Sequence, residues 1–500
     1  MAERTLVRGG EVCDGSGADP VARDVLIEDG VIAALLPPAS SPPPADTVID
    51  ASGLVVAPGF IDAHSHGDTT KLEYPDNRSK VRQGITTEVD GNCGFSAGCV
   101  PGSAAGFVWK DLAEYARLLD RRPAATNTVV LCGHNDLRRV VMGDRDRRAT
   151  AEELDRMRRL LAAAFASGAA GWSTGLTYFP GKFADTTELL ALSELTRGTR
   201  KVYATHLRSE GDALLESADE ALAIARAGSG RLQISHLKTM FPRNFGKLDA
   251  LVAKLEAARR DGLTLHADRY PYIYTSTRIG QALPPPYDQD PGIAAKLRGS
   301  AAFRDEITAA LAGCPRDLPT TILPEHGETL AEIAARTHCS VERVCMMEIM
   351  RDPETCVAFR CMSEDNLRRI LALPWVCAGT DSISRQLDDP ADHGHPRGVG
   401  AFPRFFRLTR ELCGVGEAVR RLTGLPAAIY RIPRRGLVKC GFVADLVIFD
   451  PERFDSAAGF RGEAPAPSGI ARVMLAGNTV WHSGEPDVYH RFGRFLPIER

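Results

Sequence analysis

The sequence predicts an α/β protein whose main domain is a closed (β/α)8 barrel of the TIM type, accompanied by a small β domain. One observation is that short β-type runs alternate with helical runs between about residues 58 and 432, which favours a parallel barrel. Another is that both ends of the chain consist of short apolar runs separated by turn residues. We therefore expect residues 1–57 and 433–500 to build the small β domain together.

The expected barrel elements follow one another along the chain. The strand candidates include "TNTVVLCGH", "KVYATHLR", "RLQISHLK", "LTLHADRYPY" and "PWVCAGTD". Helical patterns cover residues 151–167, 187–196, 211–227 and 246–261. The rhythm breaks at about residues 283–340, where "ALPPPYDQDPG" precedes further helical patterning. We expect this segment to be an insertion that lies over the mouth of the barrel.

The composition is that of an ordinary soluble globular protein, with 44% hydrophobic and 25% charged residues. A net charge of −3 predicts neither a nucleic-acid partner nor an anionic membrane surface. There is no apolar run long enough for a transmembrane helix, and "MAERTLVRGG" lacks the apolar core of a signal peptide. Twelve irregularly spaced cysteines predict reduced thiols in the cytoplasm. The chain contains no self-assembly motif from which an oligomeric state could be predicted.

Two histidines stand where the first expected barrel strand ends, in "GLVVAPGFIDAHSHGD" at residues 53–68. Residues i and i+2 of a strand point to the same side, so His64 and His66 project together. Barrel active sites are built at the carboxyl ends of the strands, and imidazole is a common metal ligand. An alternative for this pair alone is one buried and one exposed histidine without a metal.

Other potential metal ligands end strand-like runs in the same way. His206 ends "KVYATH", His236 follows "RLQIS" one βα unit later, and Asp381 ends "PWVCAGTD". Cys93 lies where the β-type run of "GITTEVDGNCG" breaks at glycines. Imidazole, thiolate and carboxylate groups that converge from several strand ends indicate a metal site.

The chain resembles the amidohydrolase superfamily and, within it, the N-acyl-D-amino-acid deacylases (D-aminoacylases). The motifs that carry the resemblance are "PGFIDAHSH", "GITTEVDGNCGFS", "THLRSEGD", "ISHLK" and "HPRGVGAFPR". The first of these indicates only the superfamily, whereas "GNCG" with "ISHLK" and "HPR…FPR" is narrower. The resemblance extends from about residue 5 to residue 481 and implies the barrel with a small β domain from both termini.

The resemblance also implies a set of metal ligands. His206 and His236 would bind a tight zinc ion, and Cys93 would supply a thiolate where many superfamily members use a carboxylated lysine. His64 and His66 would bind a second metal in a weaker site. A thiolate is a suitable replacement, because zinc lowers the pKa of a coordinating thiol and binds it deprotonated.

Asp381 matches the family's catalytic carboxylate at the end of the last strand and is also expected to contact metal. The expected reaction is hydrolysis of the amide bond of a small N-acyl-D-amino acid, with Asp381 as general base and then general acid. For the substrate carboxylate, the resemblance points to four residues. They are Lys238, Tyr270, Ser276 and Arg397.

Three departures from the family pattern leave the substrate class open. The acidic pair after the two histidines is Gly67-Asp68, the usual "GHGTLR" is "GHNDLR", and the usual "SDG" is "TDS". One alternative is a cyclic-amide hydrolase of the dihydroorotase or hydantoinase kind, although these normally carry a bridging lysine. Another is a deacylase of a different N-acyl amine, and a third is a non-enzymatic scaffold. The preferred side chain, acyl group and number of bound metals are not predicted.

Overall fold

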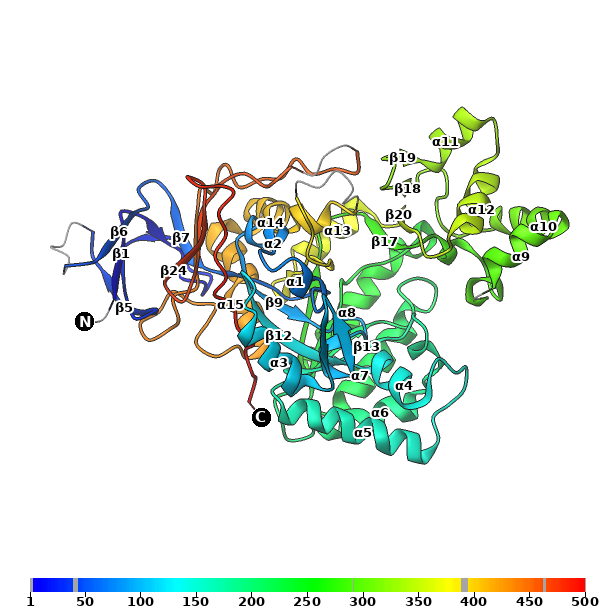
Figure 1. Cartoon of the computed structure of the whole chain (residues 1–500), viewed down its shortest axis with the longest axis horizontal. Helices are drawn as coiled ribbons and strands as arrows, with labels where there is room; N and C mark the ends of the chain where they lie inside the picture. Colours follow the sequence, from blue (N-terminus) through cyan, green and yellow to red (C-terminus); the bar gives the residue numbers. More distant parts are fainter. Residues whose placement is uncertain (1–2, 39–43, 291, 388–393, 462–464, 500) are drawn as a thin grey trace.

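A barrel of eight parallel strands forms the centre of the molecule (Figure 1). The computed structural model describes residues 3–38, 44–290, 292–387, 394–461 and 465–499. The barrel strands follow chain order around the sheet. They are β8 (Phe60–Asp62), β9 (Ile85–Asp90), β12 (Asn127–Gly133), β13 (Gly171–Gly175), β14 (Val202–His206), β15 (Arg231–Ile234), β16 (Thr264–Arg269) and β21 (Val376–Ala378).

Helices pack around the outside of this barrel, as the alternating pattern of the sequence predicts. The short helices near the first strands are α1 (Thr70–Glu73) and α2 (Arg78–Val81). The longer ones are α3 (Leu112–Arg121), α4 (His134–Met142), α5 (Ala151–Ala166), α6 (Thr186–Ser193), α7 (Leu214–Ala227), α8 (Leu248–Arg260), α13 (Glu364–Leu371), α14 (Arg397–Leu422) and α15 (Gly424–Tyr430). A small hairpin of β10 (Gly102–Ala104) and β11 (Phe107–Trp109) precedes α3.

Two further sheets lie beside the barrel, at the left of Figure 1. One contains β1 (Arg4–Arg8), β4 (Asp24–Glu28), β5 (Val31–Leu36) and β6 (Thr47–Asp50). The other contains β2 (Glu11–Val12), β3 (Val21–Ala22), β7 (Val55–Pro58), β22 (Leu446–Phe449), β23 (Ile470–Leu475) and β24 (Asn478–His482). Strand β7 pairs with β22, so segments from both ends of the chain share one sheet.

The chain passes from this sheet into the barrel at Gly59, between β7 and β8. A Cβ atom at this position would lie 2.2 Å from the Oγ1 atom of Thr86, so the close packing requires glycine here. The apolar run of residues 55–62 therefore contributes strands to two sheets. It forms β7 of the small β region and then β8, the first barrel strand.

An inserted unit lies at the other end of the molecule, at the right of Figure 1. Its strands β17 (Tyr274–Arg278), β18 (Ile322–Leu323), β19 (Glu328–Thr329) and β20 (Cys356–Arg360) form one sheet. Its helices are α9 (Ile293–Gly299), α10 (Ala301–Leu311), α11 (Leu330–Thr337) and α12 (Val341–Arg351). The unit has its own apolar core. It is longer than the insertion expected at about residues 283–340, because β17, which precedes that segment, and β20, which follows it, belong to the same sheet.

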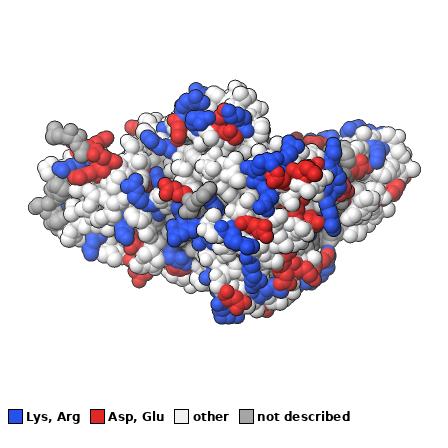
Figure 2. All heavy atoms as spheres, turned by 90° about the horizontal axis from the view of Figure 1, so that it is seen from below, with Lys and Arg blue, Asp and Glu red and all other residues white. Residues whose placement is uncertain are grey.

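The face of the molecule shown in Figure 2 carries positive and negative side chains interspersed, without a large field of one sign. This agrees with the small net charge of −3. Among the described residues, none of the helices combines the length and the apolar character that crossing a membrane would need.

Candidate metal and active site

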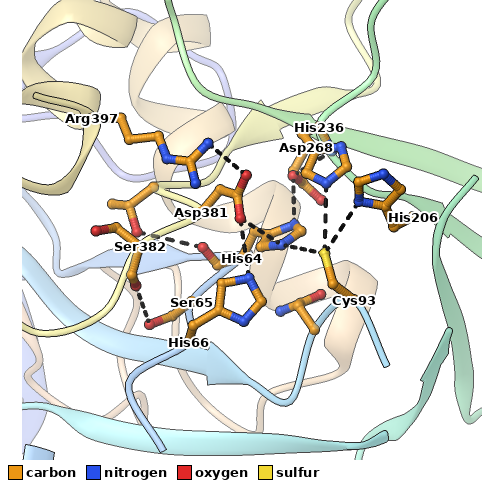
Figure 3. A network of polar contacts seen from close by, with 12 residues as sticks. His64, Ser65, His66, Cys93, His206, His236, Asp268, Asp381, Ser382 and Arg397 are labelled. Carbon is orange, nitrogen blue, oxygen red and sulfur yellow. Dashed lines mark hydrogen bonds and ion pairs between the residues drawn. The ribbon is translucent and has the colours of Figure 1, made fainter. Parts of the chain in front are cut away.

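The predicted metal ligands all come from the carboxyl ends of barrel strands and lie together in Figure 3. His206 is the last residue of β14, and the others follow the strands within a few residues. These others are His64 and His66 after β8, Cys93 after β9, His236 after β15 and Asp381 after β21. Parallel strands of a barrel end on one face, which is why residues so distant in sequence meet there.

The thiol of Cys93 lies at the centre of three imidazole rings (Figure 3). Its Sγ atom is 3.3 Å from Nε2 of His64, 3.7 Å from Nδ1 of His206 and 3.6 Å from Nε2 of His236. A neutral thiol has one proton and cannot satisfy three facing nitrogen atoms. In a tetrahedral zinc site, a sulfur and a nitrogen ligand are about 3.5 Å apart. The donor set therefore fits a zinc ion.

The electrostatic surroundings favour a deprotonated Cys93. Burial alone would raise the pKa of the thiol, but the charge on His64 and the hydrogen bonds to His206 and His236 hold it well below its usual range. The thiolate is the form of cysteine that binds a metal. The geometry and the electrostatics of the site thus both favour a Cys93 thiolate that binds metal.

Asp268, in β16, fixes the orientation of His64. Its Oδ1 atom lies 3.0 Å from Nδ1 of His64 and also accepts a hydrogen bond from the backbone N–H of His236 at 2.8 Å. When Nδ1 of His64 carries the proton, the lone pair of Nε2 faces Cys93, as a metal ligand requires. The contact therefore holds His64 in the orientation that a metal ligand needs.

Glu210 is a site residue that the sequence reasoning missed. Its carboxylate lies 3.3 Å from Nε2 of His206 and 3.0 Å from Nδ1 of His236, so it contacts both rings on the side away from Cys93. It also accepts a hydrogen bond from Nζ of Lys238 at 2.6 Å. The available signal was its position four residues after His206 in "THLRSE". Carboxylates in this arrangement orient ligand histidines.

Asp381 lies between Arg397 and the two histidines His64 and His66 and contacts all three (Figure 3). Its Oδ1 atom is 3.1 Å from Nε2 of His66 and 3.4 Å from Nε2 of His64, and its Oδ2 atom is 2.8 Å from Nη1 of Arg397. Burial would raise the pKa of this carboxyl, but Arg397 and His64 hold it well below its usual range. The ionised group can accept a proton.

Three of these side chains stand on strained backbone. Cys93, His236 and Asp381 have φ angles of 53°, 37° and 49°, in the left-handed region that non-glycine residues rarely adopt. Such conformations cost of order 1–3 kcal/mol each and persist where the surrounding structure enforces them, often at functional sites. The strain turns these side chains toward one another at the strand ends.

A buried lysine joins the first and last barrel strands beneath the site. Nζ of Lys80, in α2, donates to Asp62 at 2.8 Å, Ser65 at 3.2 Å, Thr380 at 2.6 Å and the carbonyl of Ser382 at 3.1 Å. In the described part of the chain, one isolated bridge, between Ser65 and Ser382, pairs these two sides. Lys80 therefore links the backbone segments that carry the two histidines and Asp381.

A cavity of about 220 Å³ opens beside the ligands. The four predicted substrate-binding residues all line it, together with three of the candidate metal ligands. The four are Lys238, Tyr270, Ser276 and Arg397, and the three are His206, His236 and Asp381. Tyr178 and Arg316 line it as well and were not predicted from the sequence. The cavity therefore places polar and cationic side chains next to the metal ligands.

Two further histidines have structural contacts. His395 lies in a loop and is buried: its Nε2 faces the carbonyl of Tyr274 at 3.1 Å, and its Nδ1 accepts from the backbone N–H of Arg397 at 3.0 Å. His395 thus fixes the start of α14, whose first residue is Arg397. His134, the first residue of α4, lies 2.7 Å from the carboxylate of Glu188.

Comparison with known proteins agrees with this geometry. A family model described as the amidohydrolase family matches residues 47–260. The N-acyl-D-glutamate deacylase of Alcaligenes xylosoxydans xylosoxydans is 34% identical over 98% of this chain and 96% of its own length. The D-aminoacylase of the same organism is 34% identical over 95% of this chain and 94% of its own.

Solved structures extend the likeness to three dimensions. The N-acyl-D-glutamate deacylase of Bordetella bronchiseptica, solved with zinc and a phosphonate mimic of the tetrahedral intermediate, has a TM-score of 0.83 and 32% identity, with 99% of this chain and all of that chain covered. A D-hydantoinase from Thermus sp. reaches a TM-score of 0.59 at 16% identity, with 99% of both chains covered, and shares the fold. The full-length likeness to the deacylases, on a barrel with these ligands at its mouth, places the chain in the N-acyl-D-amino-acid deacylase family of the amidohydrolases.

Proposed function

We propose that this protein is a zinc-dependent hydrolase that cleaves N-acyl-D-amino acids to a carboxylic acid and a free D-amino acid. The observation that carries the proposal is the convergence of three imidazole nitrogens on Sγ of Cys93, at 3.3–3.7 Å, beside a cavity lined by Asp381 and Arg397. The curated relatives named for this reaction cover nearly the whole chain. The twelve free cysteines support a cytoplasmic location.

In the proposal, Cys93, His206 and His236 hold the tight zinc, and His64 and His66 hold a weaker second site. The carboxylate of Asp381 lies next to the ring nitrogens of His64 and His66, at the weaker site. When bound, zinc supplies a Lewis acid for the amide carbonyl and lowers the pKa of a water molecule. Asp268 and Glu210 keep the rings of the ligand histidines in the required orientation.

Asp381 is the proton carrier in this scheme. Its ionised carboxylate takes a proton from the attacking water and then delivers it to the nitrogen of the leaving amino acid. Arg397 lies 2.8 Å from Oδ2 of Asp381 and keeps that carboxylate ionised before the reaction. The same arginine, with Tyr270, Ser276 and Lys238, lines the space for the substrate carboxylate.

A cyclic-amide hydrolase is disfavoured by the same site. Cys93 occupies the place where such enzymes are expected to carry a bridging lysine. The sequence likeness to a D-hydantoinase of Streptomyces coelicolor covers 13% of this chain, whereas the likeness to the two deacylases covers 98% and 95% of it. A non-enzymatic scaffold is disfavoured because all six predicted ligands are present and meet at one end of the barrel.

The test is hydrolysis of a panel of N-acetyl amino acids of both hands, together with a hydantoin and dihydroorotate, with chiral analysis of the product. We expect release of D-amino acids and none of the L-isomers. The Asp381→Ala variant, purified in the same way, controls for contaminating hydrolases. Hydrolysis of L-substrates alone, or of cyclic amides alone, would contradict the proposal.

A further inference from the structure

The turn that carries Cys93 passes through the left-handed region of backbone conformation. It comprises residues 91–94, "GNCG", directly after β9. Gly91 and Gly94 each have a φ angle of 81°, which costs glycine little, whereas Cys93 has one of 53°. A non-glycine residue keeps such a conformation only where its surroundings enforce it. Another part of the protein must therefore hold this turn.

The buried hydroxyl of Ser173, in β13, spans the turn. Its Oγ atom donates to the carbonyl of Gly91 at 2.5 Å and accepts a hydrogen bond from the backbone N–H of Gly94 at 3.0 Å. The side chain of Ser173 is completely buried. A hydroxyl has one proton and two lone pairs, so it can bind both backbone groups at once. Ser173 therefore fixes the backbone on both sides of Cys93.

Strand β13 also approaches the turn closely at its last residue, Gly175. A Cβ atom at this position would lie 2.0 Å from the carbonyl oxygen of Cys93, so the contact requires glycine. The strand carries none of the predicted metal ligands. Its sequence, "GWSTG", instead places a hydroxyl and a backbone without a side chain against the turn of Cys93.

The position of the Cys93 thiol depends on this turn. In the observed conformation, Sγ lies 3.3–3.7 Å from three imidazole nitrogens (Figure 3). Without the hydroxyl, the carbonyl of Gly91 and the N–H of Gly94 would lose a partner, and both residues are buried. Leaving buried polar groups unpaired is unfavourable. The turn would then relax, which relieves the strain at Cys93 and moves its thiol away from the imidazoles.

We infer that Ser173 is a positioning residue for the zinc site: its hydroxyl holds Cys93 in the conformation that binds metal and thereby sets the zinc affinity of the protein. The inference rests on the proposed function, in which Cys93 is a ligand of the tight zinc. Ser173 acts through the backbone of Gly91 and Gly94 and is not itself a ligand. Groups that orient a metal ligand contribute about 10–100-fold to metal affinity.

The experiment compares the zinc affinity of the wild type and of Ser173→Ala by competition with a chelator. We expect the dissociation constant for zinc to rise about 10–100-fold in the variant. Cobalt(II) gives a second measurement, because a thiolate bound to cobalt produces a charge-transfer absorption band. This band should be weaker or shifted in Ser173→Ala at saturating cobalt. Wild-type zinc affinity with an unchanged band in Ser173→Ala would overturn the inference.

Ser193→Ala is the matched control for the loss of a buried hydroxyl. Ser193, in α6, is also completely buried, and its Oγ atom donates to the carbonyl of Ile224 at 2.6 Å. The substitution removes the same chemical group from the outer layer of helices, so zinc affinity should stay at the wild-type value. Equal losses of zinc affinity in Ser193→Ala and Ser173→Ala would overturn the inference, because affinity would then follow general stability.

Two further variants test whether the hydroxyl acts through Cys93. Ser173→Thr keeps the hydroxyl and should bind zinc more tightly than Ser173→Ala. Adding Ser173→Ala to Cys93→Ala should weaken the remaining zinc binding little, since the thiol that Ser173 positions is already absent. Equal losses in Ser173→Thr and Ser173→Ala, or losses that add in the double variant, would overturn the inference.

The failure of this inference differs from that of the proposed function, because the experiment measures metal binding rather than turnover. A wild type that binds zinc tightly, with the expected loss in Ser173→Ala, but hydrolyses no N-acyl-D-amino acid would contradict the proposed function and leave the role of Ser173 standing. An active wild type with unchanged zinc affinity in Ser173→Ala would overturn the inference alone.

Discussion

The backbone N–H of Asp381 donates to the carbonyl of His64 at 2.8 Å. Close by, the N–H of His66 donates to the carbonyl of Ser382 at 3.2 Å. These contacts connect the segment after the first barrel strand with the segment after the last. Backbone hydrogen bonds at the place where the barrel closes thus help to set the distance between the histidine pair and Asp381, independently of the side chain at position 381.

Replacing Asp381 by Asn should remove hydrolysis while the protein stays folded. The amide keeps the size of the side chain but cannot take up a proton, and general acid–base catalysis contributes roughly 10²–10⁴-fold. We expect kcat to fall by at least that factor, with an unchanged circular dichroism spectrum and an unchanged zinc content. Normal turnover in Asp381→Asn would show that another group carries the proton.

Replacing Cys93 by Ala should release the tightly bound metal. The thiol faces three of the four ligand imidazoles, so its loss removes the central ligand of the set. Removing an orienting partner of a ligand typically costs 10–100-fold in metal affinity, and removing the ligand itself should cost at least as much. Zinc per chain after dialysis is the measurement. Cys440→Ala, which removes an exposed thiol, is the matched control and should keep its zinc.

Replacing Lys80 by Met should destabilise the closure of the barrel. The ammonium is completely buried against Asp62, and its removal leaves that carboxylate buried and uncompensated. Breaking a buried ion pair in this way costs about 3–5 kcal/mol. Urea unfolding of the zinc-free protein measures the change without the contribution of the metal.

The control for Lys80 is Lys110→Met, because Lys110 forms an exposed pair with Glu114. An exposed ion pair is screened by solvent and contributes little to stability, so this variant should unfold near the wild-type midpoint. Equal effects of the two substitutions would show that the buried network does not hold the first and last strands together.

His266, in β16, predicts a pH dependence of stability that is independent of the metal site. Burial, followed by the nearby charges of Arg259, Arg231 and Arg420, lowers its pKa to about 3. A histidine whose folded-state pKa lies below its unfolded value of about 6.5 costs stability as the pH falls from about 6.5 toward 3, because only the unfolded chain binds the proton. At pH 5 this cost is roughly 2 kcal/mol.

The measurement compares His266→Gln with the wild type by thermal unfolding at pH 8 and at pH 5. The variant lacks the titrating group, so its stability should fall less than that of the wild type when the pH is lowered from 8 to 5. The comparison within each pH cancels effects that both proteins share. A constant difference between the proteins at both pH values would contradict the assignment.

The barrel could be predicted because its strands have clear patterns and end in chemically distinctive residues. The runs that became β12, β14, β15, β16 and β21 are rich in β-branched and apolar residues. Strand β13, "GWSTG", carries two glycines and one β-branched residue, and it was not among the predicted strands. Its place in the sheet is determined by pairing with β12 and β14.

The site could be predicted less completely than the barrel. His206 and His236 stand out because each ends a strand-like run, whereas Glu210 follows the strand in a loop and carries no pattern of its own. Arg316 lies in the inserted unit, and only the tertiary arrangement shows that it reaches the cavity. Which side chains of an insertion line a cavity is a property of three-dimensional packing and cannot be recognised from the sequence.

The central claim is that a metal held around Cys93 enables the cleavage of N-acyl-D-amino acids. The most direct measurement is the rate at which chelator-treated, metal-free protein releases a D-amino acid from its N-acetyl derivative as zinc is added back. We predict a negligible rate without metal and a rise to a plateau near one zinc per chain, with no such rise in Cys93→Ala. Full activity of the metal-free protein, or the same zinc response in Cys93→Ala, would contradict the claim.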